Sequence, residues 1–154
     1  MNKKYMQIAI ELSINSIDNG GGPFGAVIVK NGEIIAQSSN SVTKDNDPTA
    51  HAEINAIRMA AKKLNHFDLS GCEIYSSCEP CPMCLGAIYW SGIKRLYFAN
   101  TRKDAEEAGF SDEMIYKELE KPYQYRYLKT YIMMRDEAIK AFEKWKKTEN
   151  VIRY

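Results

Sequence analysis

Two short segments carry residue types that could bind a metal and move protons. His51 and Glu53 stand two positions apart, and Cys81 and Cys84 stand three positions apart. On one helix, a spacing of three places both thiols on the same side. In the first turn of such a helix, the dipole lowers the thiol pKa and favours the thiolate that binds metal. Two thiolates and one imidazole form a ligand set of catalytic zinc, so the sequence predicts zinc held by His51, Cys81 and Cys84.

The charge of this ligand set and the position of Glu53 indicate a reactive site. Zinc and two thiolates sum to zero charge, so the site can hold hydroxide, and zinc lowers the pKa of water to about 7. Residues two apart on an ideal helix point to opposite sides, so His51 must lie at a helix entry if Glu53 is to face the same centre. Pro48 and Thr49, just upstream, are typical of such an entry.

The other two cysteines leave alternatives open. Cys78, Cys81 and Cys84 form the spacing C-x-x-C-x-x-C, which could begin an iron–sulfur site, although no fourth cysteine follows. If Cys78 were a fourth zinc ligand, the protein would be a non-catalytic zinc-binding module, because structural zinc normally has four protein ligands. Cys72 and Cys78 are instead expected to be small buried apolar side chains.

The elements that must position these residues alternate between helices and strands. Asn31 and Gly32 are typical of a two-residue hairpin turn between the first two strands. The later order of strand, helix and strand implies a parallel crossover. These features predict an α/β fold with three layers. Helices are expected at 3–19, 50–64, 81–91, 111–120 and 135–148, strands at 26–29, 33–39, 73–77 and 94–99, and an extended stretch at 123–133.

Helical spacing of apolar residues predicts which face of each long helix is buried. For the first helix the expected buried face consists of Tyr5, Ile8, Ala9, Leu12 and Ile17. For the second helix it consists of Ile54, Ile57, Ala61 and Leu64.

Length and composition limit the classes of protein that this chain can be. With 154 residues, 45% of them hydrophobic, the chain is expected to form a single domain, 1–154, with a core of its own. This hydrophobicity, together with a net charge of +1, argues against disorder. The near-zero charge also gives no reason to expect nucleic-acid or membrane partners. No targeting segment is recognised, so the expected location is the cytoplasm.

The two metal-binding segments resemble those of the cytidine deaminase superfamily. Residues 46–53 and 77–84 carry the pattern H-x-E followed by P-C-x-x-C, which is typical of zinc-dependent nucleobase deaminases. The similarity to the short bacterial guanine deaminases within this superfamily extends over nearly the whole chain, although it is thin from about Tyr123 to Lys147. It runs through 22–27, 87–90, 107–110, 115–117 and the terminal Tyr154. The resemblance implies a three-layer α/β/α sandwich with a mixed central sheet.

The resemblance also implies a reaction. His51, Cys81 and Cys84 would hold one zinc ion per subunit, and Glu53 would take a proton from the zinc-activated water. The resulting hydroxide would attack C2 of guanine, and Glu53 would return protons to the ring nitrogen and the leaving amine, giving xanthine and ammonia. tRNA adenosine deaminases carry almost the same metal motifs, so they and other nucleobase deaminases are the alternative. The net charge of +1 favours a small purine base over a polyanion.

Further roles follow from the same resemblance. Phe24, Asn40, Trp90, Asp112 and Tyr154 would surround the purine, and Asp112 would also have a catalytic role. The segment 123–154 would be exchanged between the two subunits of a homodimer, so that its terminal residue covers the partner's site. The helix expected in this segment carries an apolar stripe that needs a covering surface, formed by Ala138, Ala141, Phe142 and Trp145.

Overall fold

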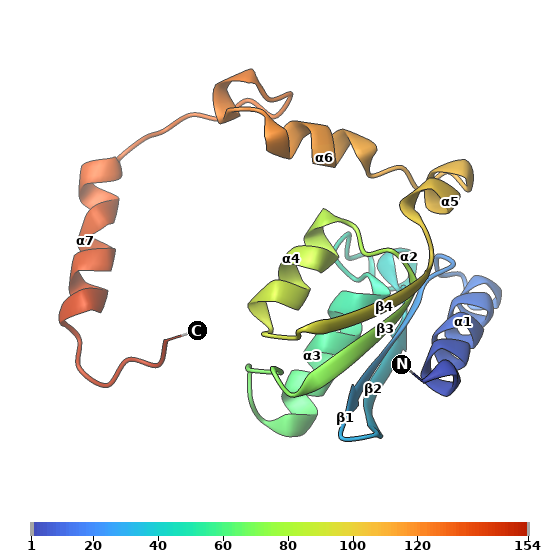
Figure 1. Cartoon of the computed structure of the whole chain (residues 1–154). Helices are drawn as coiled ribbons and strands as arrows, with labels where there is room; N and C mark the ends of the chain where they lie inside the picture. The colour runs from blue at the N-terminus through green and yellow to red at the C-terminus, as the bar shows by residue number, and fades with distance from the viewer. Residues whose placement is uncertain (1, 154) are drawn as a thin grey trace. The chain divides into compact units, whose positions relative to one another are not determined.

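The computed structural model describes residues 2–153, and the chain divides into two compact units, Met1–Asp112 and Glu113–Tyr154. The first unit contains the central sheet, and the described residues of the second form helices and irregular segments without a strand (Figure 1). The elements of the first unit are α1 (Lys3–Asp18), β1 (Gly25–Lys30), β2 (Glu33–Ser39), α2 (Val42–Asp45), α3 (Ala52–Leu64), β3 (Cys72–Cys78), α4 (Pro82–Trp90), β4 (Arg95–Asn100) and α5 (Arg102–Glu107).

The sheet of the first unit has the strand order β2-β1-β3-β4. β1 pairs antiparallel with β2 and β3, whereas β3 pairs parallel with β4. Asn31 and Gly32 join β1 to β2 with φ angles of 52° and 82°. Two successive positive φ values are those of a type I′ hairpin turn, as their residue types predict. The expected mixed sheet is therefore confirmed.

Helices cover both faces of this sheet. α1 packs on one face, and α3 and α4 lie on the other (Figure 1). Ala26 and Ile28 of β1 belong to the core on the α3 side, whereas Val27 and Val29 pack with Tyr75 on the α1 side. Because successive side chains of a strand point to opposite faces, a strand covered on both sides must be apolar throughout. The three-layer prediction is confirmed.

The expected apolar face of α1 is wrong at its C-terminal end. Ile17 is 55% exposed, whereas Ser13 and Ser16 are buried. The Ser16 hydroxyl donates a hydrogen bond of 3.2 Å to the backbone oxygen of Asn40. At this end the helix faces a polar loop in place of the sheet, so a hydroxyl is buried there and the larger apolar side chain points to solvent.

The second unit consists of α6 (Glu113–Glu120), a 3₁₀ turn at Tyr123–Tyr125 and α7 (Arg135–Lys147). α6 begins two residues later than expected, and the 3₁₀ turn interrupts the stretch predicted to be extended. None of the described residues of this unit is fully buried. The short helices α2 and α5 of the first unit were not predicted, because neither carries an apolar periodicity. No helix among residues 2–153 combines the length and apolar character needed to cross a membrane.

Candidate metal and catalytic site

The three predicted metal ligands converge at the N-terminal ends of α3 and α4. His51 is the N-cap of α3, Cys81 is the N-cap of α4, and Cys84 lies in the first turn of α4. The sulfur atoms of Cys81 and Cys84 lie 3.6 and 3.5 Å from His51 Nδ1. Tetrahedral zinc, with bonds of about 2.3 Å to sulfur and about 2.0–2.1 Å to nitrogen, requires a sulfur–nitrogen separation of about 3.6 Å. The three side chains therefore have the spacing of zinc ligands.

Local sequence explains why both helices start at these residues. Pro82 occupies the first turn of α4, where its missing N–H costs nothing. Before α3, the Asp47 carboxylate accepts hydrogen bonds of 2.7 Å from both the amide and the hydroxyl of Thr49, which closes a tight turn. His51 follows in an extended conformation, with φ −69° and ψ 155°. This entry geometry lets His51 and Glu53 face the same centre, as the sequence required.

The pKa values of the two cysteine thiols are shifted in opposite directions. A hydrogen bond from Cys84 lowers the pKa of Cys81 to about 4, against the effect of burial, and His51 adds to the lowering. The same hydrogen bond, together with burial, raises the pKa of Cys84. A divalent metal would hold both thiols as thiolates, and two soft sulfurs with an imidazole fit zinc.

Glu53 lies beside the ligands and is almost completely buried. One carboxyl oxygen, Oε1, accepts a hydrogen bond of 3.1 Å from the hydroxyl of Ser76. The other, Oε2, is 3.4 Å from the sulfur of Cys84. Burial raises the pKa of Glu53, because the charged form loses its hydration. A carboxyl group with a raised pKa next to a metal site is suited to accept and return protons.

Cys78 and Cys72 are both buried, as predicted for small apolar side chains. The thiol of Cys78 donates to the backbone oxygen of Thr101 at 3.6 Å, and burial raises its pKa to about 11. A thiol with this pKa stays protonated and does not bind metal readily. Among residues 2–153, the group close enough to share a metal is His51, Cys81 and Cys84. A three-ligand set is that of a catalytic site and does not support the structural-zinc alternative.

Phe24 and Asn40 lie next to each other on the first unit. Phe24 packs against the core cluster that includes Ala52, the residue between His51 and Glu53. The side-chain oxygen of Asn40 accepts from the amides of Gly22 and Val42, at 3.3 and 3.2 Å. These contacts fix the side chain and leave its NH₂ group as the donor that a ligand could use.

Phe110 places a second aromatic ring beside Phe24, and this residue was not among the expected substrate-binding residues. Its ring meets that of Phe24 edge to face, with centroids 5.1 Å apart. Only the similarity at residues 107–110 pointed to this segment. Close by in sequence, Asp112 is half-buried, and burial followed by the negative charge of Cys81 raises its pKa.

One expected substrate-binding residue, Trp90, is not close to the metal ligands. Trp90 is the last residue of α4 and is 74% exposed. Because an α-helix rises 1.5 Å per residue, it lies about 9 Å along the helix axis from Cys84. Tyr154 lies outside the described residues, so its expected role stays a prediction.

Comparisons with known proteins agree with this geometry. The family model for the cytidine and deoxycytidylate deaminase zinc-binding region matches residues 1–100 of the sequence. The guanine deaminase of Bacillus subtilis (strain 168) is 48% identical over 151 residues, which is 97% of this chain and 97% of that protein. Its X-ray structure superimposes with a TM-score of 0.96 and covers 100% of this chain and 99% of that chain.

More distant relatives match a smaller part of the chain. A tRNA-specific adenosine deaminase of Aquifex aeolicus (strain VF5) is 44% identical over 100 residues, 64% of this chain and 66% of that protein. A solved guanine deaminase from Nitrosomonas europaea aligns with a TM-score of 0.70 at 37% identity, over 73% of this chain and 65% of that chain. These two alignments cover 64% and 73% of the chain, whereas the alignment with the Bacillus subtilis guanine deaminase covers 97%.

Proposed function

The chain belongs to the family of the cytidine and deoxycytidylate deaminase zinc-binding region, and from that membership we propose that it hydrolyses guanine to xanthine and ammonia. The observation that carries this choice of substrate is the extent of the match to the Bacillus subtilis guanine deaminase. An alignment of 151 residues includes nearly all of Glu113–Tyr154, which lies outside the zinc-binding region of residues 1–100. The similarity therefore extends well beyond what any zinc deaminase would share.

The proton transfers of this reaction are assigned to Glu53. When bound, zinc supplies a water molecule whose pKa is lowered to about 7. Glu53 takes the proton of the attacking water at Oε2, the carboxyl oxygen nearest the ligands. It delivers this proton to the purine ring nitrogen, then takes the second proton, from the hydroxyl now bonded to C2, and passes it to the amino group, which leaves as ammonia. Burial raises its pKa, which favours the protonated form that must carry the proton from one transfer to the next.

Binding of the purine is assigned to the residues around Phe24. The rings of Phe24 and Phe110 offer apolar surface to a flat heterocycle. The free NH₂ group of Asn40 can donate to a ring nitrogen or to the O6 carbonyl of guanine. Asp112 can accept from ring N–H groups, and we assign it a part in proton transfer as well. Trp90 and Tyr154 remain assigned to the purine site through the family resemblance.

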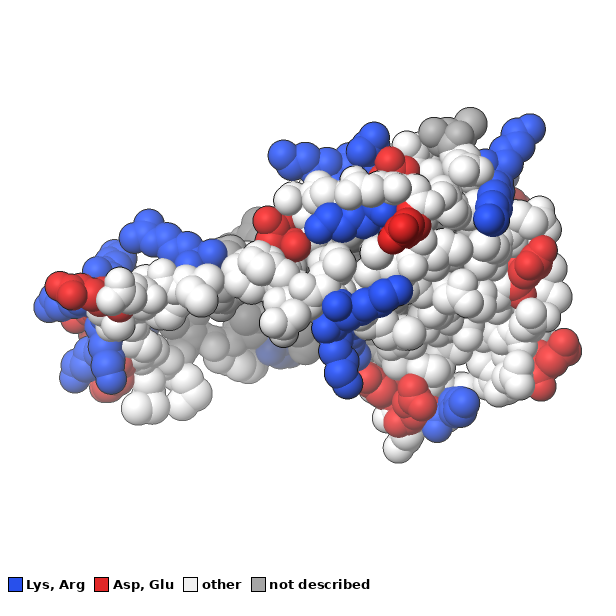
Figure 2. Space-filling model, turned by 90° about the horizontal axis from the view of Figure 1, so that it is seen from below, with Lys and Arg blue, Asp and Glu red and all other residues white. Residues whose placement is uncertain are grey.

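Charge supports a small substrate over a polynucleotide. The chain has a net charge of +1. On the face seen in Figure 2, basic and acidic side chains lie interspersed, without a continuous basic surface. Proteins that bind nucleic acids present clustered Lys and Arg to the phosphate backbone.

Release of ammonia from guanine is the first expected result. Zinc-loaded protein should convert guanine to xanthine, followed by ammonia release and by the change in ultraviolet absorbance. A tRNA anticodon hairpin, tested with the same preparation, should yield no inosine. Conversion of the tRNA adenosine without turnover of guanine would show that the substrate belongs to the alternative class.

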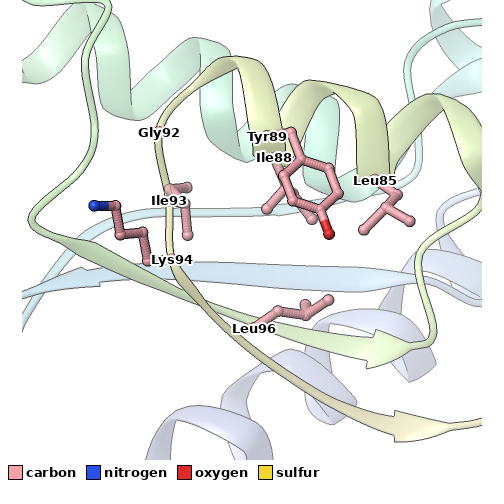
Figure 3. A pocket seen from close by; sticks show the side chains of 7 residues that line it. All are labelled: Leu85, Ile88, Tyr89, Gly92, Ile93, Lys94 and Leu96. Atoms are coloured by element: carbon pink, nitrogen blue, oxygen red, sulfur yellow. The ribbon is translucent and has the colours of Figure 1, made fainter.

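We also propose that the protein is a homodimer in which the segment 123–154 is exchanged. In the second unit, apolar side chains on both helices and the segment between them are exposed, including Met114, Leu119, Leu128, Ile132, Phe142 and Trp145. The first unit has an apolar groove of about 450 Å³ between α4 and β4, lined by Leu85, Tyr89 and Leu96 among others (Figure 3). Exposed apolar surface of this extent supports burial against a second copy of the chain.

A mixing experiment tests this exchange. The protein should sediment at twice 17.6 kDa. Deletion of Tyr154 should lower kcat/KM on the order of tenfold or more, because the site loses part of its closure against water. When this variant is refolded together with a Glu53→Gln chain that keeps its tail, exchanged dimers contain one complete site, and turnover should exceed that of both parents. A mixture no more active than its parents, or a monomer in solution, would contradict the exchange.

A further inference from the structure

Ser76 is a buried hydroxyl in the middle of an apolar strand face. It is 2% exposed and lies in β3, whose other side chains on the α3 side include Cys72 and Ile74. β3 is an interior strand, and Ser76 pairs with Ala26 of β1 and Phe98 of β4. Two flanking strands therefore hold its backbone in place. A buried hydroxyl costs free energy unless it finds a partner, and the partner here is Glu53.

We propose that Ser76 is a positioning residue that holds the Glu53 carboxylate in its catalytic orientation. The inference rests on the proposed function, in which Glu53 carries the protons. The first turn of α3 fixes the Glu53 backbone, and the Ser76 hydroxyl binds Oε1 at 3.1 Å. This hydrogen bond restrains rotation of the carboxyl group and leaves Oε2 on the side of the metal ligands, 3.4 Å from the sulfur of Cys84.

Metal binding increases the importance of this hydrogen bond. Two side chains donate to Glu53 among the described residues, Cys84 to Oε2 and Ser76 to Oε1. A cysteine that ligates zinc does so as a thiolate and has no proton to donate. In the zinc-loaded protein, Ser76 is therefore the side chain that still holds the carboxylate. Ser76 thus orients the proton carrier beside the metal ligands, and misplacement of a catalytic group by about 1 Å can cost about 100-fold in rate.

Removal of the hydroxyl should affect turnover and leave substrate binding nearly unchanged. Ser76→Ala is expected to lower kcat for guanine about 10–100-fold, with KM within about twofold and one zinc per chain retained. Ser76→Thr keeps a hydroxyl and should recover most of the lost kcat. Ser13→Ala is the matched control, because Ser13 is also buried and its hydroxyl donates to Ile10 O at 2.7 Å in α1. Its kcat should equal that of the wild type.

A crystal structure of the zinc-loaded Ser76→Ala variant provides a readout independent of turnover. We expect the Glu53 carboxylate to adopt a second orientation, or to rotate away from the metal ligands. A kcat within twofold of the wild type, a loss confined to KM, or a Glu53 carboxylate that keeps its single orientation would overturn the proposal. If the wild type itself leaves guanine unchanged, the proposed function fails, and the orientation of Glu53 in the crystal still decides the role of Ser76.

Discussion

Glu53→Gln is expected to lower kcat for guanine by about 10³–10⁴-fold while one zinc ion per chain remains bound. General acid–base catalysis by one side chain contributes about 10²–10⁴-fold, and Glu53 is assigned more than one proton transfer, so the upper part of this range applies. Glutamine has the same shape and can still accept from Ser76 through its amide oxygen. Glutamine cannot accept and release a proton as the carboxylate does, so the fall in kcat measures the contribution of proton transfer.

The Tm of the metal-free Glu53→Gln variant is the control for correct folding. Burial raises the pKa of Glu53 in the folded protein above its unfolded value. The contribution of Glu53 to the free energy of unfolding is therefore fully present at low pH, where the carboxyl group is protonated. It is lost as the pH rises through the folded pKa, because the buried group must then ionise. As the pH rises above the unfolded pKa of Glu53, the Tm of metal-free Glu53→Gln should thus gain relative to that of the metal-free wild type. Retention of wild-type turnover, or loss of zinc, would remove Glu53 from the role of proton carrier.

Cys84→Ser is expected to abolish stable zinc binding and, with it, turnover. Cys84 is fully buried in the first turn of α4, and its sulfur lies 3.5 Å from His51 Nδ1. A serine hydroxyl at this site is a hard and uncharged donor that cannot replace a thiolate. Because loss of an outer partner of a metal ligand already costs 10–100-fold in affinity, loss of the ligand itself should cost more than about 100-fold. Elemental analysis of the dialysed protein measures the zinc content directly.

Cys78→Ser is the matched control for this substitution. Cys78 is also buried and belongs to the same cysteine cluster, but its thiol donates to Thr101 O. We expect this variant to keep one zinc per chain and to remain active. Loss of zinc from Cys78→Ser as well would point to four protein ligands and a structural site.

The metal site was predictable from the sequence because its residues lie close together in two short segments. The spacing of Cys81 and Cys84, and the need for His51 to lie at a helix entry, depend on local helix geometry alone. Both expectations hold in the structure. The alternation of helices and strands likewise predicted the three layers, whereas the mixed sheet was implied by the family resemblance.

Ser76 and Phe110 were not predicted, because their contacts depend on tertiary packing. The partner of Ser76 lies on α3, and that of Phe110 lies in the loop before β1. Neither contact leaves a periodic pattern in the sequence. Ile17 was predicted to be buried from helical spacing alone, which does not show where a helix leaves the sheet and meets a polar loop.

The convergence of α3 and α4 on one centre also links distant parts of the chain. His51 and Cys81 are 30 residues apart, and β3 lies between them. A metal that joins them acts as a cross-link, which restricts the unfolded chain as a disulfide would. For a closed loop of this length the chain-entropy model gives about 3–4 kcal/mol. The ion that activates water would thus also supply a large share of the 5–15 kcal/mol by which a domain resists unfolding.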